Sequence, residues 1–535
     1  MGKKIAYIAQ ATNIAKTLAF DIKPSIVIGL ALHWSWVWLG FWSMACYSAT
    51  PSFSFLSETI EQVQPLWAFS LFANSVSLAV LFALRNRLAP LASRQFMPVA
   101  SALFTALSTL LVSWPPVLAV SGMENALYIV AALLTGVGSA VSFALWGELL
   151  TVLGMRQTVV YGVAATVVGS ILYFIGLIVG HQATRVALVL MPIVGMRLYW
   201  SQRGLVGAQP KHPSQEDAAL SSPSQYISMP LDHPRRTRVR TGDGIGGKPE
   251  AAHAPHTAKQ SGTLRKDFIV LVAISLFFGT SYGLIKGLTA TNDMALTVPR
   301  DALNIMAFFV GALAIFLSMS VFKMDFKRLT YQVSLPLMAA GFVFLPLMGV
   351  FQPVGFFLHQ LGYQYFYVVL WALWPAMARG YENVPPMAFC CASITGMQTG
   401  QLLGSIAGAA ALLASDDRFT LAMIATVAVF VILLVALFGF GNAMLKSGWW
   451  MAQPMGEDRP AKFRNTCKTI ASNRGLSARE TEVFMLLAKG RNCSYISKQL
   501  VISEPTVKTH MRNVYRKLGV HSQQALLDLV EFESN

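Results

Sequence analysis

The stretch SEPTVKTHMRNVYRKLGV, residues 503–520, lies near the end of a chain of 535 residues and predicts a helix with two different sides. Ser503 is a preferred N-cap, and the glutamate and proline that follow it are typical of a first helical turn. At 100° per residue, one side of this helix carries an apolar stripe of Val507, Met511, Val514 and Leu518. The opposite side is polar and strongly basic. The stretch therefore predicts a helix that packs on a small core and leaves a cationic surface exposed.

The residues around this helix predict a compact helical domain. Ser477 and Glu480 have the spacing of a capping box, and Gly490 is placed to end the helix that they begin. A second short helix is predicted over residues 494–500, and Ser522 can cap a fourth helix near the C-terminus. Two helices joined by a tight turn, of which the second is basic, form a helix-turn-helix.

This C-terminal segment closely resembles the LuxR-type DNA-binding domain. Its L-[ST]-x-R-E-x-E-V pattern is present as Leu476, Ser477, Arg479, Glu480, Glu482 and Val483. Its I-S-x-x-T-V-K-T-H pattern is present as Ile502, Ser503, Thr506, Val507, Lys508, Thr509 and His510, and its K-L-G-V pattern is residues 517–520. The family's usual N-K-E-I-A stretch is replaced by residues 493–497, which read C-S-Y-I-S.

The resemblance implies that the domain binds double-stranded promoter DNA in the major groove. The positions of Lys508, Thr509 and Arg512 are expected to face bases, and others are expected to hold phosphates. The full set of expected DNA-binding residues is Ser503, Glu504, Thr506, Lys508, Thr509, Arg512, Asn513, Arg516 and Lys517. The last helix, with Ala525, Leu526, Leu529 and Val530, resembles the family's dimerisation helix, so a homodimer on DNA is expected; alternatively, these residues only close the small core.

Most of the chain before this domain has the composition of a membrane protein. Hydrophobic residues make up 54% of the chain and charged residues only 12%, whereas an average soluble chain has about 25% charged residues. A membrane span needs about 20 mostly apolar residues. Twelve segments qualify: 24–47, 66–85, 96–117, 124–152, 158–180, 183–200, 267–288, 301–321, 331–351, 354–378, 386–413 and 419–442.

The basic residues of the short loops predict the orientation of these spans. With the N-terminus inside, the inner segments contain twelve basic residues: Lys3, Lys4, Lys16, Lys23, Arg85, Arg87, Arg94, Arg156, Lys323, Lys327, Arg328 and Arg379. The outer loops contain three: Arg185, Arg300 and Arg418. Cytoplasmic loops are enriched in lysine and arginine. We therefore expect a multi-pass protein of the inner (plasma) membrane with both termini in the cytoplasm.

Composition divides the chain into five parts. Residues 201–265 are rich in Pro, Gly, Ser and charge and predict a disordered cytoplasmic linker. The linker separates a first six-helix half, residues 1–200, from a second half, residues 266–445. A tether over residues 446–472 then precedes the DNA-binding domain, residues 473–535. The predicted fold class is all-α: a twelve-helix membrane bundle of six plus six helices, followed by a four-helix domain.

The membrane region resembles the major facilitator superfamily in its twelve spans, long central loop and cytoplasmic termini. A weak internal repeat agrees with two halves, because FALWGEL at 143–149 and WALWPAM at 371–377 occupy the fourth span of each half. The family's loop pattern G-x-x-x-D-R-x-G-R-R/K is reduced to LRNRLAPLASRQ in the first half, without its Gly and Asp. The second half retains Asp325, Lys327 and Arg328.

Polar groups within membrane spans point to function because they are costly to bury. The expected sensing residues are His33, Glu148, Lys286, His359 and Gln364, which would respond to an unknown small ligand. The five cysteines form no C-x-x-C pair, and we identify no metal cluster, catalytic triad or cofactor motif. The chain is therefore expected to be a membrane-bound one-component transcriptional regulator and not an enzyme. The alternative is an active secondary transporter with a regulatory DNA-binding domain.

Overall fold

The protein forms helices and no strands within the residues that the structure describes. The computed structural model describes residues 22–42, 65–113, 124–207, 255–289, 300–347, 351–378, 381, 383–414, 418–435, 467, 469–500 and 502–534. The chain divides into two compact units, Met1–Pro454 and Met455–Asn535. The first unit contains the long apolar helices and the second contains the basic helix-turn-helix, so the predicted all-α class is confirmed.

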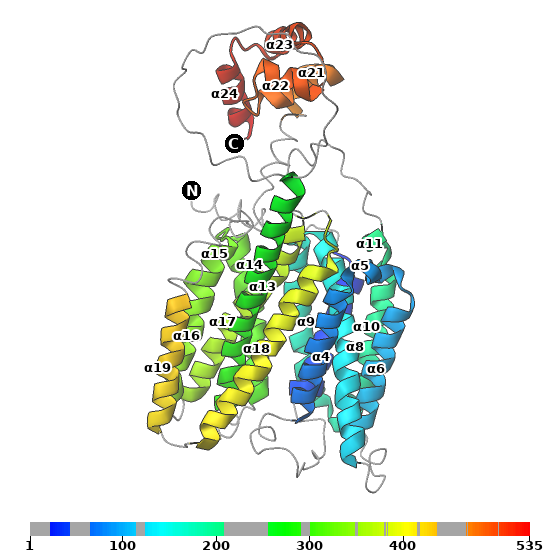
Figure 1. Ribbon diagram of the computed structural model, residues 1–535, viewed down its shortest axis with the longest axis vertical. Coiled ribbons are helices and arrows are strands. Elements are labelled where there is room, and N and C mark those ends of the chain that lie inside the picture. Colours follow the sequence, from blue (N-terminus) through cyan, green and yellow to red (C-terminus); the bar gives the residue numbers. More distant parts are fainter. Residues whose placement is uncertain are drawn as a thin grey trace, which may run out of the picture. The chain divides into compact units, whose positions relative to one another are not determined.

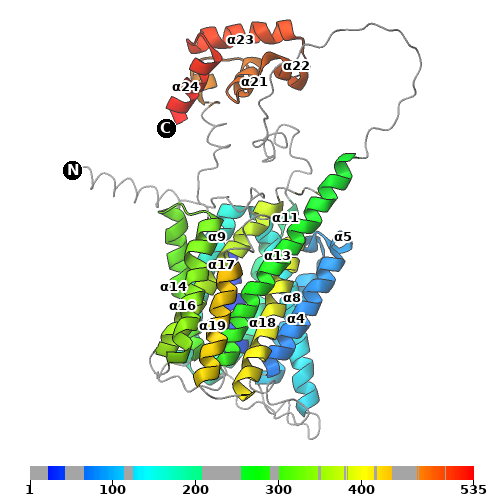
Figure 2. The same cartoon turned by 60° about the vertical axis from the view of Figure 1, so that its left-hand side comes forward.

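The membrane unit is built from two sets of helices (Figures 1 and 2). The first set is α2 (Pro24–Val37) with its π-helical continuation η1 (Trp38–Trp42), α4 (Pro65–Ala83), α6 (Phe96–Ser113), α8 (Glu124–Leu153), α9 (Met155–Val179) and α10 (His181–Gln202). The second set is α13 (Pro255–Leu288), α14 (Arg300–Ser320), η5 (Leu329–Ser334) with α16 (Leu335–Phe344) and η6 (Leu345–Leu347), α17 (Phe351–Ala378), α18 (Met387–Ala414) and α19 (Arg418–Leu434). Short helices α5 (Arg85–Leu88), η3 (Leu91–Ser93), α11 (Gly204–Gly207) and α15 (Phe326–Arg328) lie at their ends.

The same pattern of helix contacts occurs in both sets. In the first set, α2 packs on α9, α4 packs on α8, and α8 and α10 both pack on α6. In the second set, α13 packs on α18, α14 packs on α17, and α17 and α19 both pack on α16. Each helix pair of the second set thus corresponds to a pair of the first set, with both helices taken from the same places in the order of their own set. The contacts between the sets are also paired, since α4 and α8 pack on α18 as α14 and α17 pack on α9.

Close backbone contact joins α13 and α18, which lie side by side in both views (Figures 1 and 2). Glycines recur every four residues on the facing sides, at Gly279, Gly283 and Gly287 of α13 and at Gly396, Gly400, Gly404 and Gly408 of α18. A Cβ atom at Gly283 would overlap the carbonyl oxygen of Gln401, and one at Gly404 would overlap that of Thr280. Small residues allow membrane helices to approach in this way.

Eight helices in the described ranges are long and apolar enough to cross a membrane, and two shorter apolar helices cover Pro24–Gly40 and Phe419–Ile432. The protein is therefore a multi-pass membrane protein, whereas the count of twelve spans stays a prediction. α17 and α18 overlap two of the predicted spans but are not among the eight. Their buried glutamine side chains lower the mean hydropathy of these two helices.

Several element bounds differ from the domain limits that composition predicts. α13 begins at Pro255, ten residues before the end of the segment 201–265 that we expect to be a linker. Residues 208–254, which form most of that segment, lie outside the described residues. Near the C-terminus, Cys467, Ile470 and Ala471 belong to the core of the second unit, although they lie in the predicted tether.

The second unit has a core of its own. Its helices are α21 (Ala478–Leu487), α22 (Cys493–Leu500), α23 (Glu504–Leu518) and α24 (Gln523–Ser534). Buried side chains from all four helices meet in one cluster, which includes Phe484, Ile496, Val507 and Leu526. Since this cluster needs no residue of the membrane unit, we expect the second unit to fold by itself.

Candidate functional site

The start and end of α23 are fixed by the residues that the sequence singles out. Ser503 caps the helix by accepting the backbone N–H of Thr506 at 3.3 Å. Gly519 ends it in the left-handed conformation, with φ at 71°, which glycine adopts without steric cost. The preceding helix has the predicted capping box of Ser477 and Glu480. The helix-turn-helix is thus set by local caps as well as by its core.

α23 has the two-sided character that its sequence predicts. Val507, Val514 and Leu518 are buried, and Met511 packs against the same core. The exposed residues are Ser503, Glu504, Thr506, Lys508, Thr509, Arg512 and Arg516, while Asn513 is half-buried. Eight of the nine expected DNA-binding residues therefore lie on or beside one accessible face. An exposed basic helix of this kind fits a major groove.

Lys517, the ninth residue of the expected set, has partners inside its own domain. Its ammonium group donates to a carboxylate oxygen of Glu480 at 2.7 Å and to the carbonyl oxygen of Gly475 at 3.0 Å. The hydrogen bond from Lys517 and that from the backbone of Ser477 lower the pKa of Glu480 to about 2. Lys517 thus ties the end of α23 to the start of α21, and its expected role on DNA has the least geometric support.

The last helix contributes to the core and also leaves part of its surface accessible. Leu526 and Val530 of α24 are buried, whereas Ala525 and Leu529 are half-buried. Gln523 donates to the carbonyl oxygens of Leu487 and Arg491, both at 3.1 Å, and so fixes α24 against the end of α21. The core-closing alternative therefore accounts for Leu526 and Val530, and dimerisation stays a prediction.

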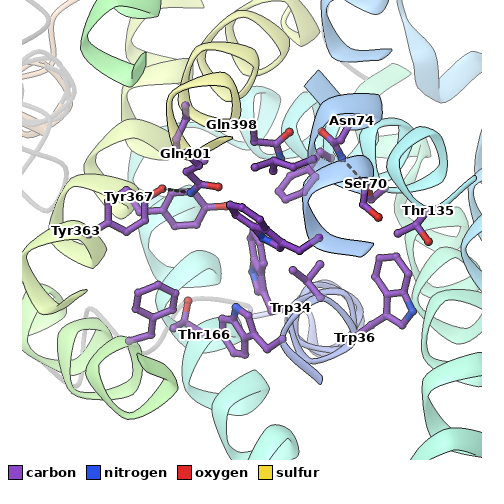
Figure 3. Close-up of a pocket in the computed structure, with 18 of the residues that line it drawn as sticks. Trp34, Trp36, Ser70, Asn74, Thr135, Thr166, Tyr363, Tyr367, Gln398 and Gln401 are labelled. Carbon is purple, nitrogen blue, oxygen red and sulfur yellow. Dashed lines mark hydrogen bonds between the residues drawn. The ribbon is translucent and has the colours of Figure 1, made fainter. Parts of the chain in front are cut away.

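A pocket lies between the two helix sets of the membrane unit. It has an empty volume of about 790 Å³, which includes space open to solvent. Eight of its 19 described lining residues are aromatic: Trp34, Trp36, Trp38, Trp67, Phe143, Phe308, Tyr363 and Tyr367. Figure 3 shows side chains from both sets converging on this space, which no single helix encloses.

The polar residues of the pocket are amides and hydroxyls, and no charged side chain occurs among the described lining residues. Gln401 donates to the hydroxyl of Tyr363 at 2.7 Å. Four buried oxygen atoms of the lining have no hydrogen-bond partner within the described part of the chain: Ser70 Oγ, Asn74 Oδ1, Gln364 Oε1 and Gln398 Oε1. Buried polar groups are normally paired, so this set is where an additional partner would fit.

The structure brings only one of the five expected sensing residues, Gln364, into the pocket lining. His33 is near it, because its ring lies 4.9 Å from the ring of Phe143 and its Nδ1 atom is 3.1 Å from the hydroxyl of Ser142. Lys286 is also near it, with its ammonium group 3.8 Å from the ring centre of Trp67.

The other two expected sensing residues lie within helix and loop contacts. His359 of α17 pairs through Nε2 with the hydroxyl of Ser281 at 3.0 Å. Glu148 of α8 is fully buried and accepts the backbone N–H groups of Leu91 and Ala92 at 3.1 and 3.0 Å. Its carboxyl group thus holds the loop that follows α4. This is the loop that lacks the Gly and Asp of the major facilitator pattern.

A row of aromatic rings leads from the pocket to the end of the bundle where α8 ends and α18 begins. The ring of Trp371 lies 4.9 Å from that of Trp34, 5.2 Å from that of Tyr367 and 5.5 Å from that of Trp374. Trp374 donates to the hydroxyl of Ser393 on α18 at 2.8 Å. These contacts form a continuous row of packed side chains from the pocket to Ser393 near the start of α18.

The second unit matches a known family along most of its length. Residues 474–530 match the family described as bacterial regulatory proteins, luxR family. The chain is 41% identical over 64 residues to the spore germination protein GerE of Bacillus subtilis, covering 12% of this chain and 86% of that relative. It is 48% identical over 60 residues to the nitrate/nitrite response regulator protein homolog of Haemophilus influenzae, covering 11% of this chain and only 28% of that relative.

About three quarters of the chain is also similar in fold to solved structures of membrane transporters. One is the major facilitator superfamily transporter FucP in its outward conformation, at 14% identity and a TM-score of 0.46, covering 78% of this chain and 98% of that one. Another is the proton:xylose symporter XylE, at 12% identity and a TM-score of 0.49, covering 77% of this chain and 94% of that one.

Proposed function

Because the chain belongs to the LuxR family of bacterial regulatory proteins through its C-terminal domain, we propose that it is a membrane-bound one-component transcriptional regulator. The observation that carries this proposal is the exposed basic face of α23 on a unit that is covalently joined to a multi-pass membrane unit. The helix would read promoter DNA, and the membrane unit would keep it at the bilayer surface. The proposed location is the inner membrane, with both termini in the cytoplasm.

The membrane unit is proposed to be the sensor. A ligand shifts an equilibrium only if it binds one conformation better than another. The pocket between the two helix sets suits this requirement, because any movement of one set against the other changes its walls. The aromatic row through Trp371 and Trp374 would carry the change to the end of the bundle proposed to face the cytoplasm.

A second candidate function, secondary transport, is favoured by one observation. The pocket lies between two helix sets with repeated contacts, an arrangement that transporters use for alternating access. Uptake measured with vesicles that contain the full chain would separate the two functions. Substrate accumulation without any promoter binding would favour transport.

Reporter fusions test the topology on which the regulator proposal depends. Fusions after residues 230 and 460 should both report the cytoplasm, since DNA is found there. A periplasmic signal at residue 460 would exclude DNA binding by the full chain in the cell.

A further inference from the structure

From the composition of the pocket, we infer that its ligand is an uncharged small molecule with a flat ring and several hydrogen-bond donors. The inference deepens the proposed sensing function and rests on it. It assigns the pocket a ligand class by four properties of its walls: their charge, their aromatic rings, their unpaired oxygens and a local break in helix geometry.

The charge of the walls disfavours an ionic ligand. No Asp, Glu, Lys, Arg or His occurs among the described lining residues. An ion that leaves water without a partner of opposite charge is strongly penalised. Lys286 lies outside the lining, with its Nζ atom 3.8 Å from the ring centre of Trp67. The described lining therefore contains no group of opposite charge for an ionic ligand.

The rings of the walls favour a flat ligand. Trp34, Trp38 and Phe308 line the pocket together with Tyr363 and Tyr367, and their rings come from α2, η1, α14 and α17. Neighbouring rings already pack on one another, with 6.2 Å between the ring centres of Trp34 and Trp38. A ring inserted among them gains both buried apolar area and the offset or edge-on contacts that aromatic groups prefer.

The unpaired atoms of the walls call for donors on the ligand. Asn74 shows this most directly. Its amide nitrogen donates to the hydroxyl oxygen of Ser139 at 2.6 Å, and Ser139 uses its own hydrogen to donate to the carbonyl of Gly136. Ser139 therefore acts as the acceptor for Asn74, which fixes the amide and leaves Asn74 Oδ1 as an unpaired acceptor in the lining.

Two glutamines extend this acceptor surface. Gln364 and Gln398 are buried, they line the pocket, and the Oε1 atom of each has no partner among the described residues. Figure 3 shows Asn74 and Gln398 on the same side of the pocket, across from Trp34 and Thr166. A ligand that places a ring against the indoles would thus present its N–H or O–H groups to these amides.

The helix geometry beside the pocket agrees with a binding role. Trp38 begins the π-helical segment η1, which continues α2. Single-turn π-helical segments are rare and are frequent at functional sites. Trp38 is also one of the four residues of α2 and η1 that line the pocket, so the change in helix geometry occurs within the lining.

Three probes with the same phenol ring test the ligand class by charge. They are 4-hydroxybenzamide, which is neutral and has several donors, tyramine, which is a cation, and 4-hydroxybenzoate, which is an anion. Binding to the purified full chain in detergent micelles is measured by titration calorimetry at pH 7. The neutral probe should bind in the millimolar range, at least about tenfold more tightly than either ion. Tighter binding of an ionic probe, or no binding of the neutral one, would overturn the inference.

A matched pair of variants locates the site. Gln364→Met removes an unpaired amide of the lining and should weaken binding of 4-hydroxybenzamide at least about fivefold, because a hydrogen bond is lost. Gln360→Met removes a buried amide from the same helix, one turn away and outside the lining, and should leave binding unchanged. Equal effects of the two substitutions would place the probe elsewhere and contradict the inference. Gln398→Met gives the same test if Gln364→Met does not fold.

The same preparations separate this inference from the proposed function. Duplex DNA binding by the full chain should persist in Gln364→Met, because the DNA-binding face has a core of its own. If the neutral probe does not bind while DNA still does, the ligand class is wrong and the regulator remains. If the parent chain does not bind duplex DNA, the proposed function is wrong, whatever the result with the neutral probe.

Discussion

Arg512 and Lys517 carry the same charge on the same helix, but they have different surroundings. Arg512 is exposed on the face that carries Lys508 and Thr509. Lys517 donates to Glu480 and to the carbonyl of Gly475, so its ammonium group is used within the domain. The two residues should therefore respond differently to removal.

Arg512→Ala should reduce sequence discrimination. If the guanidinium reaches a base edge, the substitution costs about 1–3 kcal/mol for the preferred operator and much less for other sequences. The measurement is binding of a fragment 455–535 to an operator selected from a random duplex library and to a scrambled duplex. Arg474→Ala, an exposed basic residue outside α23, is the control and should leave discrimination unchanged. An even loss on both duplexes would instead assign Arg512 to phosphate contact.

Lys517→Met should destabilise the domain in a pH-dependent manner. The pKa of Glu480 is lowered to about 2 by Lys517 and by the backbone of Ser477. A carboxylate with a depressed pKa contributes stability above its unfolded value of about 4.3, and this contribution is lost as the pH falls toward 2.

Urea unfolding of the fragment 455–535 measures this effect. At pH 7 the variant should lose about 1 kcal/mol, a modest value because Lys517 is partly exposed. The difference between parent and variant should shrink steadily below about pH 4.5. A difference that stays constant down to pH 2.5 would show that the ion pair with Glu480 does not stabilise the domain.

Glu148→Gln separates anchoring from sensing. A glutamine keeps one acceptor oxygen, so one of the two backbone N–H groups of Leu91 and Ala92 loses its partner. We expect a loss of about 1–3 kcal/mol in the stability of the membrane unit. Thermal unfolding of the full chain in micelles should show this loss, and binding of 4-hydroxybenzamide should be unchanged. Normal stability with a lost response to the cell's inducing condition would restore Glu148 as the sensing residue.

At the scale of elements, the close contact between α13 and α18 requires glycine at the facing positions, because a Cβ atom there would overlap the backbone of the other helix. Gly283→Ala places a methyl group against the backbone of Gln401, which cannot move without shifting α18. Overpacking of this kind typically costs about 1–3 kcal/mol. The matched control is Gly162→Ala in α9, where the nearest atom to a new Cβ is 3.7 Å away, in Trp371.

The yield of monodisperse full chain in micelles, together with its thermal midpoint, measures the effect. Gly283→Ala should lower both quantities, and Gly162→Ala should leave them unchanged. Equal behaviour of the two variants would mean that α13 and α18 can separate at little cost.

The elements that the sequence predicted well are those with local signals. Ser477 and Glu480 form the predicted capping box, and Ser503 caps α23, because caps depend on residues three positions apart. The apolar stripe of α23 was predicted for the same reason. The pocket was not predicted, because Asn74, Gln364 and Gln398 come from three helices that are far apart in the sequence. Of these, only Gln364 is among the expected sensing residues, whereas Asn74 and Gln398 resemble ordinary polar residues of a membrane helix until the helices are packed.

Long-range partners also explain why only one of the five expected sensing residues lines the pocket. Glu148 was selected for the cost of burying a carboxylate, but that cost is offset by two backbone donors in a loop more than 50 residues earlier. A sequence shows that such a residue needs a partner and does not identify it. The α8 and α17 repeat, by contrast, could be inferred from A-L-W in both copies, and the repeated helix contacts agree with it.

At the scale of the whole molecule, the proposed function joins a membrane sensor and a DNA-binding domain in one chain. Under this proposal the DNA-binding domain stays tethered to the membrane unit, so the promoter would have to approach the membrane. Loss of the membrane unit should therefore change where and when the domain binds, but not which sequence it prefers. The C-terminal unit has a core of its own, which includes none of the described residues of the membrane unit.

The most direct test of this account is genome-wide promoter occupancy of the full-length chain in cells, measured by crosslinking and immunoprecipitation alongside Arg512→Ala. The account predicts discrete promoter peaks that share one sequence motif, for a protein that fractionates with the membrane, and loss of those peaks in Arg512→Ala at equal protein level. A membrane-localised chain with no enriched sites, or with the same peaks in the variant, would contradict the claim that α23 reads DNA from the membrane.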